Sequence, residues 1–497
     1  MINIFPIKHL DRACFVRKVL LWFIAIILLI GGTSIPSVQA ATLAQSVWSS
    51  VVHYYNPNSS SGQLNIVYYR ADGSDVATAP RTIPAHGSGS FLMADAGLET
   101  GFQGSAVVSS GLPLLAVTLK AGPSRDAYSP LLSASFISEQ AGIGKFFIPL
   151  FQRTPAFDPV VGIQNIEPTP IRVDMTFYPD DGSAAILILN DRVIPGQASV
   201  QVHASGEEFA GFPPEFDGSL VIQAVFNQSP YASARIVASV EQTQTNGWRA
   251  FSYEGSAGTA TELYAPQAAC LWGEEELTSQ FDVQNTGSSA ASVSITYYDI
   301  AGQVLGTQTS TTIQPGAKVF MNTCDLAEMG GSMGSAVIRS SQPLSAITRV
   351  ITTTGLMTAF TAQPRMTSGY QSGGHYRVAI PYAQYSSREN GDRAIFFIQN
   401  ASDGIQSDII ANYYAEDGNL LQSQQLANTE SPLPAYASTL TDPDSALVVD
   451  PAKGGFTGTV EIVSGAPVVV LVRVQRNLEV DGFTLLGEDY SGIPVKP

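Results

Sequence analysis

The segment Tyr297-Tyr298-Asp299-Ile300-Ala301-Gly302 places two aromatic side chains directly before a short turn that ends in glycine. Glycine accepts the positive φ angle that tight hairpin turns require, so the segment predicts a β-hairpin. The same order occurs three more times, in Tyr68–Gly73, Phe177–Gly182 and Tyr413–Gly418. A motif that returns at similar intervals along a chain indicates an internal repeat.

Four further landmarks accompany the aromatic pair in every copy, always in the same order. An asparagine closes a strand-like run upstream, and its distance from the turn glycine varies by a single residue. A proline turn, a Gly-Ser or Gly-Thr strand start and a second turn proline follow downstream. We interpret the asparagines and glycines as structural landmarks of the repeat: Asn56, Asn165, Asn285 and Asn400, with Gly73, Gly182, Gly302 and Gly418.

Hydrophobicity between the landmarks alternates with a period of two, as in Ser292–Tyr297, where Val, Ile and Tyr share one face. No stretch after residue 40 keeps a helical period with caps. Each copy fits about seven short strands in roughly 100–115 residues, which is the size of a β-sandwich. The sequence therefore predicts an all-β chain of four tandem sandwiches, joined by short connectors as a semi-rigid string of beads. Their expected bounds are 41–135 (repeat 1), 144–256 (repeat 2), 260–366 (repeat 3) and 375–491 (repeat 4).

These ordered landmarks resemble those of immunoglobulin-like sandwich repeats in bacterial secreted and cell-surface proteins. The resemblance covers nearly all of the chain after residue 40 and implies an immunoglobulin-like fold for each repeat. Members of such families are typically stalks, adhesins, envelope components or accessory modules beside enzymes. The motifs are structural, so the resemblance carries over no catalytic residue.

Residues 1–40 have the pattern of a secretory signal peptide. Basic residues precede the apolar run Val19–Ile30, and Val38-Gln39-Ala40 supplies the small residues that signal peptidase accepts. We expect the mature chain to begin at Ala41 and to be exported to the periplasm, the cell surface or the medium. The alternative is an uncleaved N-terminal anchor. No later apolar stretch approaches the length of a membrane span.

Composition narrows the function classes. The chain carries 25 basic and 42 acidic residues, a formal net charge of −17, which argues against nucleic acid as a partner. Its 5 histidines and 3 cysteines leave little material for a transition-metal site, and we expect neither a cofactor nor a metal. Acidic turns such as Asp180-Asp181 and Glu416-Asp417 leave calcium open, although hairpin chemistry explains them as well.

One segment matches a catalytic motif by letter. Gly330–Gly334 reads Gly-Gly-Ser-Met-Gly, the spacing of a nucleophile elbow. An elbow needs a helix after the serine, whereas a β-branched strand follows here, and repeat 3 contains no histidine. We therefore expect no catalytic residue in this chain.

Cys270 and Cys324 are the two cysteines that remain once the signal peptide, with Cys14, is removed. Both fall in repeat 3, and an exported protein meets oxidising conditions, so we predict a disulfide between them. The alternative is two free, buried thiols.

Together these features predict an exported, non-enzymatic structural or interaction protein, of adhesion or stalk type, in the bacterial envelope or surface. Its partner would be another envelope or extracellular protein or a polysaccharide. The alternative is a carbohydrate- or matrix-binding accessory protein that uses the aromatic pairs as a stacking platform. In the simpler interpretation of the pairs, one ring enters the core and the other covers a sheet face. An extracellular hydrolase is the least supported class.

Overall fold

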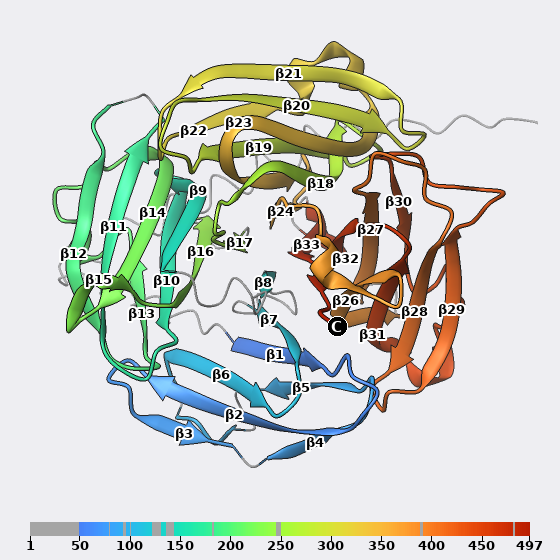
Figure 1. Cartoon of the computed structure of the whole chain (residues 1–497), viewed down its shortest axis with the longest axis horizontal. Coiled ribbons are helices and arrows are strands. Elements are labelled where there is room, and N and C mark those ends of the chain that lie inside the picture. Colours follow the sequence, from blue (N-terminus) through green and yellow to red (C-terminus); the bar gives the residue numbers. More distant parts are fainter. Residues whose placement is uncertain are drawn as a thin grey trace, which may run out of the picture. The chain divides into compact units, whose positions relative to one another are not determined.

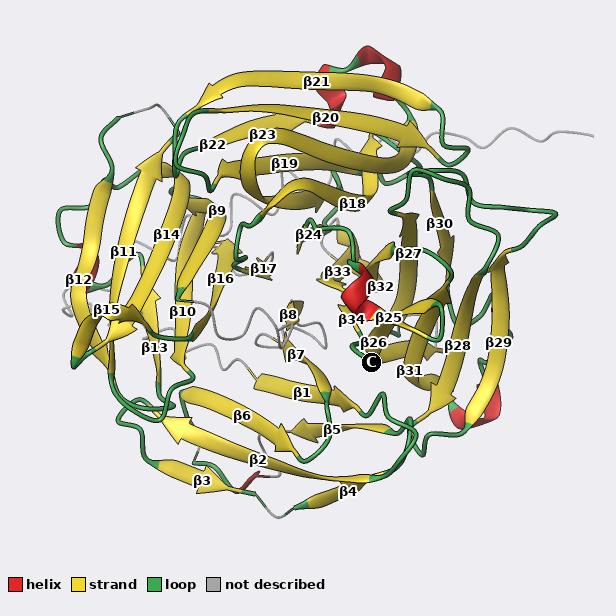
Figure 2. Cartoon of the chain, in the orientation of Figure 1, coloured by secondary structure: helices red, strands yellow, loops and turns green. Residues whose placement is uncertain are grey.

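The computed structural model describes residues 49–497, apart from 79, 93–95, 100, 122–130, 136–143, 181–182, 245–249, 388–390 and 481–482. The expected signal peptide, 1–40, lies outside the described residues. Throughout the described part, strands joined by loops and a few short 3-10 helices make up the chain (Figure 2). The all-β prediction is therefore confirmed. Val47–Pro497 forms one compact unit.

Repeat 1 contributes two antiparallel sheets. One has the order β5-β1-β7-β8, and in the other β2 pairs with β3, β4 and β6. The strands are β1 (Ser49–Tyr55), β2 (Gly62–Arg70), β3 (Asp75–Ala77), β4 (Arg81–Ile83), β5 (Ser88–Leu92), β6 (Gly104–Ser110), β7 (Leu115–Ala121) and β8 (Leu131–Ser135).

Repeat 2 also has two antiparallel sheets, of orders β13-β10-β16-β17 and β12-β11-β14-β15, with β9 paired to β14. The elements are β9 (Lys145–Arg153), β10 (Phe157–Asn165), β11 (Ile171–Pro179), β12 (Ile186–Ile194), β13 (Ser199–His203), η2 (Glu207–Phe209), β14 (Phe216–Phe226), β15 (Ser229–Ser233), β16 (Ile236–Gln244) and β17 (Ala250–Glu254).

In repeat 3 one long strand, β23, joins the two halves into a single sheet. Its first half pairs with β18 and β20, and its second half pairs with β19 and β24. The elements are β18 (Ala260–Cys270), β19 (Thr278–Asn285), β20 (Ala291–Asp299), β21 (Val304–Ile313), β22 (Lys318–Asn322), η3 (Thr323–Asp325), η4 (Ala327–Met329), β23 (Ser332–Ile351) and β24 (Met357–Thr361).

Repeat 4 is one sheet of order β29-β28-β31-β26-β27-β32-β33, with β25, β30 and β34 as additional partners. The elements are η5 (Ser368–Tyr370), β25 (Gln371–Ser372), β26 (His375–Ser386), β27 (Arg393–Asn400), β28 (Ile409–Ala415), β29 (Leu420–Ala427), β30 (Ser438–Thr441), η6 (Pro451–Lys453), β31 (Gly455–Ser464), β32 (Val468–Val480), β33 (Phe483–Ser491) and β34 (Ile493–Pro494).

The period-two pattern explains how the strands bury one face. In β11 the side chains of Ile171, Val173, Met175 and Phe177 are buried, and the residues between them are partly exposed. Each repeat has its own hydrophobic cluster, built almost entirely from its own strands. The cluster of repeat 2 also includes Ile347 and Ala359 from repeat 3. Neighbouring repeats therefore share apolar contacts at their edges.

The order of the repeats in space differs from the expected string of beads. Figure 1 shows the sheets following one another around a common centre. One strand near the end of each repeat lies at this centre, and each contacts the next in turn: β8, β17, β24 and β33. Repeat 1 also contacts repeat 4, because the Ser88 N–H donates to the Glu416 carbonyl over 3.0 Å. Within Val47–Pro497 the contacts thus close into a cycle, which short connectors alone do not predict.

Candidate functional site: the junctions between the repeats

The four landmark asparagines make the same set of hydrogen bonds. Asn400 donates from Nδ2 to the carbonyls of Gly404 and Pro434 over 2.7 and 2.9 Å, and its Oδ1 accepts from the Ser402 N–H over 3.0 Å. Each of the other three donates to the carbonyl four residues ahead and to a carbonyl at its proline turn, and accepts from the N–H two residues ahead. All four are fully buried. The asparagine thus fixes the proline turn against the end of its strand.

The landmark glycines have left-handed backbone conformations in the turns that follow the aromatic pairs. Gly73, Gly302 and Gly418 have φ angles of 86°, 76° and 86°, while Gly182 lies outside the described residues. Each of the three turns packs against the proline turn of the next repeat. A Cβ on Gly302 would approach Pro434 to 2.7 Å, and one on Gly418 would come within 2.0 Å of the Ala85 carbonyl. A side chain at these positions would therefore push two repeats apart.

These turn contacts run from each repeat to the next and return to the first. Gly73 of repeat 1 lies against Pro195 and Gly196 of repeat 2, and Gly418 of repeat 4 lies against Ala85 of repeat 1. Between repeats 2 and 3 the ring of Tyr178 covers Gly316, where a Cβ would lie 2.5 Å from it. The turns therefore act as the connecting surfaces of a closed cycle.

The serine of the Gly-Ser strand start adds a hydrogen bond to three of the junctions. Ser219 Oγ donates to the Gly316 carbonyl over 2.5 Å, and Ser335 Oγ donates to the Tyr436 carbonyl over 2.5 Å. Ser105 makes the equivalent bond to Gln197. Repeat 4 departs from the pattern, because its Thr459 donates to Pro381 within the same repeat.

The aromatic pairs divide their rings between a core and a junction. The first ring of each pair is buried in its own repeat, with Tyr297 at 0% exposure. Among the second rings, Tyr298 lies 5.0 Å from the Tyr436 ring, and Tyr414 stacks on His86 at 5.1 Å. The prediction that one ring enters the core is confirmed. In repeats 2, 3 and 4 the other ring packs on the next repeat, which a single period-two strand could not indicate.

A buried ion cluster joins repeats 2 and 3. Lys318 Nζ lies 2.5 Å from Asp217 and 2.6 Å from Asp282, and Arg349 lies 3.3 Å from the other oxygen of Asp282. The side chain of Lys318 is only 1% exposed. Burial disfavours its charge, but Asp282 and Asp217 outweigh burial, so the pKa of Lys318 is raised above its ordinary value. The lysine therefore stays charged and links the two repeats.

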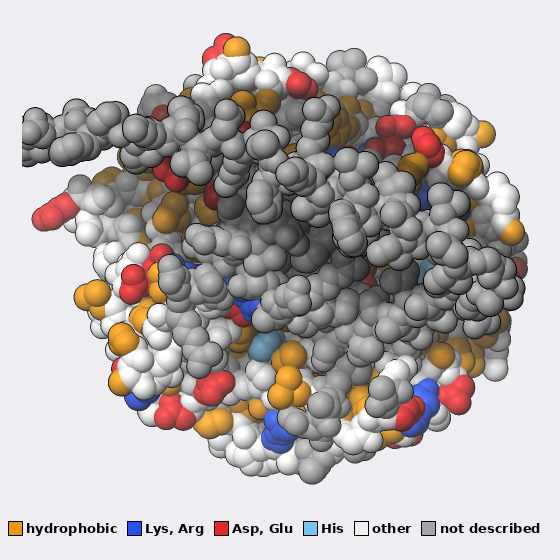
Figure 3. Space-filling view, turned by 180° about the vertical axis from the view of Figure 1, so that it is seen from behind, with side chains coloured by type: hydrophobic (Ala, Val, Ile, Leu, Met, Phe, Trp, Pro, Cys, Tyr) orange, Lys and Arg blue, Asp and Glu red, His pale blue; other side chains and the backbone are white. Residues whose placement is uncertain are grey.

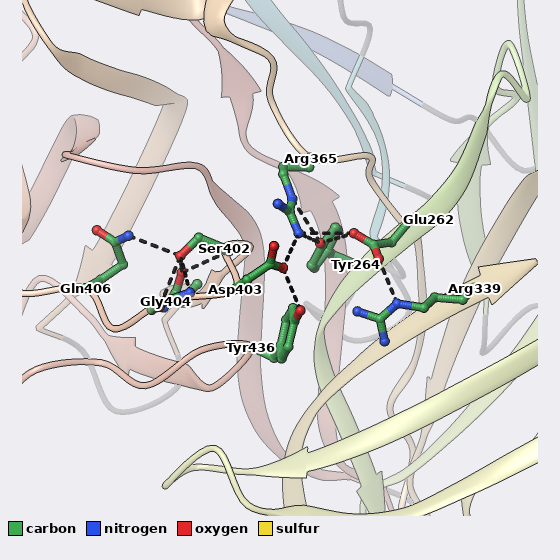
Figure 4. Close-up of polar contacts among 10 residues, drawn as sticks. Glu262, Tyr264, Arg339, Arg365, Ser402, Asp403, Gly404, Gln406 and Tyr436 are labelled. Carbon is green, nitrogen blue, oxygen red and sulfur yellow. Dashed lines mark hydrogen bonds and ion pairs between the residues drawn. The ribbon is translucent and has the colours of Figure 1, made fainter.

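A second cluster spans repeats 3 and 4, as Figure 4 shows. Arg365 donates to Asp403 over 2.8 Å, and the Tyr436 hydroxyl donates to the same carboxylate over 2.6 Å. On the other side of the cluster, Glu262 accepts from Arg339 over 2.7 Å and from Arg365 over 3.2 Å. The hydrogen bonds from Arg365 and Tyr436 lower the pKa of Asp403 to about 2. Both carboxylates are thus held ionised by guanidinium groups, which suits a structural connection better than proton transfer.

The junction between repeats 4 and 1 also has buried polar groups. Tyr55 donates its hydroxyl to Glu461 over 2.7 Å, and Arg377 donates to Glu461 and to the Pro57 carbonyl. His53 stacks on Tyr382 with ring centroids 3.8 Å apart. Burial lowers the pKa of His53 to about 4. The histidine is therefore neutral at physiological pH.

At the junction of repeats 1 and 2, Lys120 Nζ lies 2.6 Å from Glu241.

The charged residues and the histidine of the four junctions could not be singled out from the sequence, because none of them recurs in all four copies. The place of a residue in the repeat gives a partial indication that it lies at a junction. Lys318 and Tyr436 both follow closely after a turn proline, where the landmark order predicts a loop.

The predicted disulfide between Cys270 and Cys324 is confirmed, with Cα atoms 5.1 Å apart. Cys270 ends β18, and Cys324 lies in η3, where Asn322 caps the turn by accepting from the Cys324 N–H over 3.0 Å. The bond connects two parts of repeat 3, the end of β18 and η3. It is a staple within one repeat.

The described residues contain no group of three or more His, Cys, Asp and Glu side chains placed to hold a metal ion. Ser332 of the Gly-Gly-Ser-Met-Gly segment opens β23 and pairs with Cys270 in the sheet. It therefore lies in a strand rather than before a helix. Among the described residues no helix is long and apolar enough to cross a membrane.

Comparison with known proteins gives little to set beside this geometry. No protein-family model matches the chain, and no curated protein matches it in sequence. Among solved structures, Escherichia coli alpha-2-macroglobulin activated by porcine elastase is 11% identical, with a TM-score of 0.10, over 91% of this chain and 43% of that one. The native conformation of the same protein is 10% identical, with a TM-score of 0.10, over 89% and 28%. The chain spans less than half the length of these structures, and likeness at this level supports no argument.

Proposed function

We propose that this chain is an exported, non-enzymatic interaction protein of the bacterial envelope or surface, in which four repeats act as one rigid scaffold. The observation that carries the proposal is the closed series of junctions. Among the described residues, three of the turn glycines, three of the strand-start serines and three of the second aromatic rings contact the next repeat. What the repeat preserves is thus assembly of the four units.

The distribution of polar groups supports a role without catalysis. In the two clusters at repeats 2–3 and 3–4, the carboxylates face lysine or arginine partners within ion-pair distance. A general base or a nucleophile needs a poised, accessible group, and these carboxylates are neutralised by their partners. Figure 3 shows acidic, basic and apolar side chains interspersed around the periphery of the face it presents. Such a mixed surface suits contacts with other macromolecules.

Export is supported by two independent features. The first is the basic and apolar start of the sequence before Ala41. The second is the disulfide between Cys270 and Cys324, a bond that persists in oxidising compartments and is rare in the cytosol. A long stalk is the less suitable form of scaffold, because the contact between Tyr55 and Glu461 brings repeats 1 and 4 together.

The alternative, a carbohydrate-binding accessory protein, requires an exposed row of aromatic rings. The first rings of the pairs are buried, and Tyr178, Tyr298 and Tyr414 pack at junctions. These pairs therefore offer little stacking surface, and we favour the scaffold.

The proposal is tested in the native bacterium with the full-length chain. Cell fractionation and intact-mass analysis should find the protein outside the cytoplasm, beginning at Ala41. Recovery from the cytoplasm with the first forty residues intact would contradict export.

The interaction role is tested by chemical cross-linking of intact cells, which should yield adducts with envelope components. Turnover of a polysaccharide, peptide or ester substrate by the purified chain would contradict the non-enzymatic role. Glu461→Gln should weaken the adducts if they depend on the closed cycle. Lys453→Gln is the control, because the Lys453 side chain is exposed.

A further inference from the structure

The ion cluster between repeats 2 and 3 holds a lysine amine directly against a carboxylate. Lys318 Nζ donates to Asp282 Oδ1 over 2.6 Å, and the two side chains are 1% and 0% exposed. Lys120 and Lys453 also form ion pairs, but their side chains are 20% and 83% exposed. Water is thus excluded from the pair of Lys318 and Asp282 alone among these three. A site without water favours a condensation, because water would reverse it.

Two neighbouring strands hold the amine and the carboxylate in place. Asp282 lies in β19 and Lys318 in β22, and in the antiparallel register Gln284 is opposite Lys318 while Asp282 is opposite Phe320. Residues two apart on a strand share a face, so Asp282 and Lys318 are diagonal neighbours on one face of the sheet. Fixed geometry of this kind raises the effective concentration of two reacting groups by orders of magnitude.

A second carboxylate lies within reach of the same amine. Asp217 of β14 has Oδ1 2.5 Å from Lys318 Nζ. Gln152 donates to the other oxygen of Asp217 over 2.9 Å and so orients the carboxylate. A general acid–base group must lie within about 3 Å of the proton donor that it serves. Asp217 is therefore placed to take a proton from the lysine and to return it.

A guanidinium group faces the far oxygen of the reacting carboxylate. Arg349 Nη2 lies 3.3 Å from Asp282 Oδ2, and this oxygen makes no hydrogen bond among the described residues. Attack of an amine on the carboxyl carbon of Asp282 would place negative charge on Oδ2. A fixed positive group at the atom where charge develops lowers the barrier of such a step.

We propose that Lys318 Nζ and Asp282 Cγ join in an isopeptide bond, an amide between the two side chains, once in each chain. The lysine ammonium gives one proton to Asp217, and the free amine attacks Cγ. A C–N bond forms and the C–Oδ1 bond breaks. Oδ1 leaves as water with the proton from Asp217 and a second proton from Nζ, so Asp217 is again a carboxylate. Atoms and charge balance without an oxidant, a reductant or a cofactor.

The amide is a more stable end state than the ion pair. It is neutral, so two buried charges disappear from the junction, and burial of charges is costly. Asp217 and Arg349 remain, with opposite signs. The bond ties β19 to β22 in repeat 3, independently of the disulfide. Because it forms once per chain, it is not turnover, and it depends on neither export nor a partner.

Tryptic mapping of the reduced, full-length wild-type protein tests the bond. Trypsin cleaves after lysine and arginine, and the peptide 250–318, which contains Asp282, ends at Lys318 when that amine is free. An amide on Lys318 blocks this cleavage. Digestion should therefore give one peptide, 250–339, lighter than its sequence by one water molecule, and fragmentation should assign the loss to a link between residues 282 and 318. Complete cleavage into 250–318 and 319–339 at their sequence masses would overturn the proposal.

Variants distinguish the isopeptide bond from loss of water elsewhere, such as succinimide formation at Asp217-Gly218. Lys318→Arg keeps the charge but removes the amine, so its peptides should have their sequence masses. A loss of water that persists in Lys318→Arg would overturn the proposal. Asp217→Asn should slow bond formation about a hundredfold or more and leave most chains cleavable at Lys318. Full cross-linking in that variant would overturn the role of Asp217.

The matched control is Lys120→Arg, which changes a lysine in the ion pair between repeats 1 and 2. Its digest should still contain the blocked peptide 250–339. Circular dichroism of each variant confirms that the fold is retained. The wild-type map is decisive even if Lys318→Arg does not fold.

Discussion

The Tyr55 hydroxyl donates a hydrogen bond of 2.7 Å to Glu461, although 406 residues separate the two in the sequence. Both side chains are buried, at 0% and 2% exposure. Arg377 supplies the counter-charge, with Nε 3.2 Å from the same carboxylate. The bond joins β1 of repeat 1 to β31 of repeat 4, so it connects the first repeat to the last. The junction is thus where closure of the cycle can be measured.

Removing the Tyr55 hydroxyl should weaken this junction. Tyr55→Phe leaves a buried carboxylate with one hydrogen bond fewer, and such a loss costs about 1–3 kcal/mol. Urea denaturation should therefore show a lower midpoint than for the wild type. Tyr69→Phe is the matched control, because the Tyr69 hydroxyl makes no side-chain hydrogen bond among the described residues. Equal midpoints for Tyr55→Phe and the wild type would show that the bond contributes nothing.

Stability should fall in mild acid because of His53. Burial lowers its pKa to about 4 in the folded protein, against about 6.5 in the unfolded chain. Between these values the unfolded state binds more protons, so the free energy of unfolding decreases as the pH falls from about 6.5 to about 4, by up to about 3 kcal/mol. Denaturant midpoints at pH 7.0, 5.5 and 4.5 measure the change. His53→Gln should flatten the profile in this window, whereas exposed His203→Gln should not.

Loss of the Lys318 charge should be more damaging than loss of a surface lysine. Lys318→Met leaves Asp282 buried with only the more distant Arg349, and breaking a buried ion pair costs about 3–5 kcal/mol. The control is Lys453→Met, because the Lys453 side chain is 83% exposed and such pairs contribute little. Thermal denaturation of both variants distinguishes the cases. Similar melting temperatures would argue that the cluster is not a major element of the junction.

Reduction of the disulfide between Cys270 and Cys324 should lower the stability of the folded protein. The bond closes a loop of about 55 residues, for which restriction of the unfolded chain gives about 4 kcal/mol of stabilisation. Denaturation with and without reductant measures this contribution, and Cys270→Ala combined with Cys324→Ala provides a variant that cannot be reoxidised. Two alkylatable thiols in unfolded, unreduced protein from the native compartment would show that the bond is absent there.

Repeat 2 should fold when produced alone as residues 144–256. Its hydrophobic cluster is made almost entirely of its own side chains, with Ile347 and Ala359 as the contributions from repeat 3. We expect a β-sheet circular dichroism spectrum and a cooperative, less stable unfolding transition. An unfolded spectrum for this fragment, beside a folded full-length chain, would show that the junctions dominate stability.

The landmarks allowed the strand-rich fold to be predicted because it depends on local chemistry, and the disulfide could be predicted because only two cysteines follow residue 40. Alternation places Ile171 and Phe177 on one face, and a turn that needs positive φ requires a residue such as Gly302. Closure could not be predicted in this way. It depends on the rotation from one repeat to the next, which is set by contacts such as Tyr178 on Gly316. Residues that differ between copies, such as Lys318 and Glu461, make the junctions specific and leave no periodic signal.

The contact between repeats 4 and 1 has a consequence for the copy number of the unit. In an open solenoid the terminal units need polar caps, and units can be gained or lost at either end. Here the turn at Gly418 already lies against Ala85, so no end is left to extend. A gene that duplicated or deleted one unit would have to change the rotation at every junction to restore contact. Four is therefore a geometric constraint, and a chain of this design can change its loops more readily than its number of repeats.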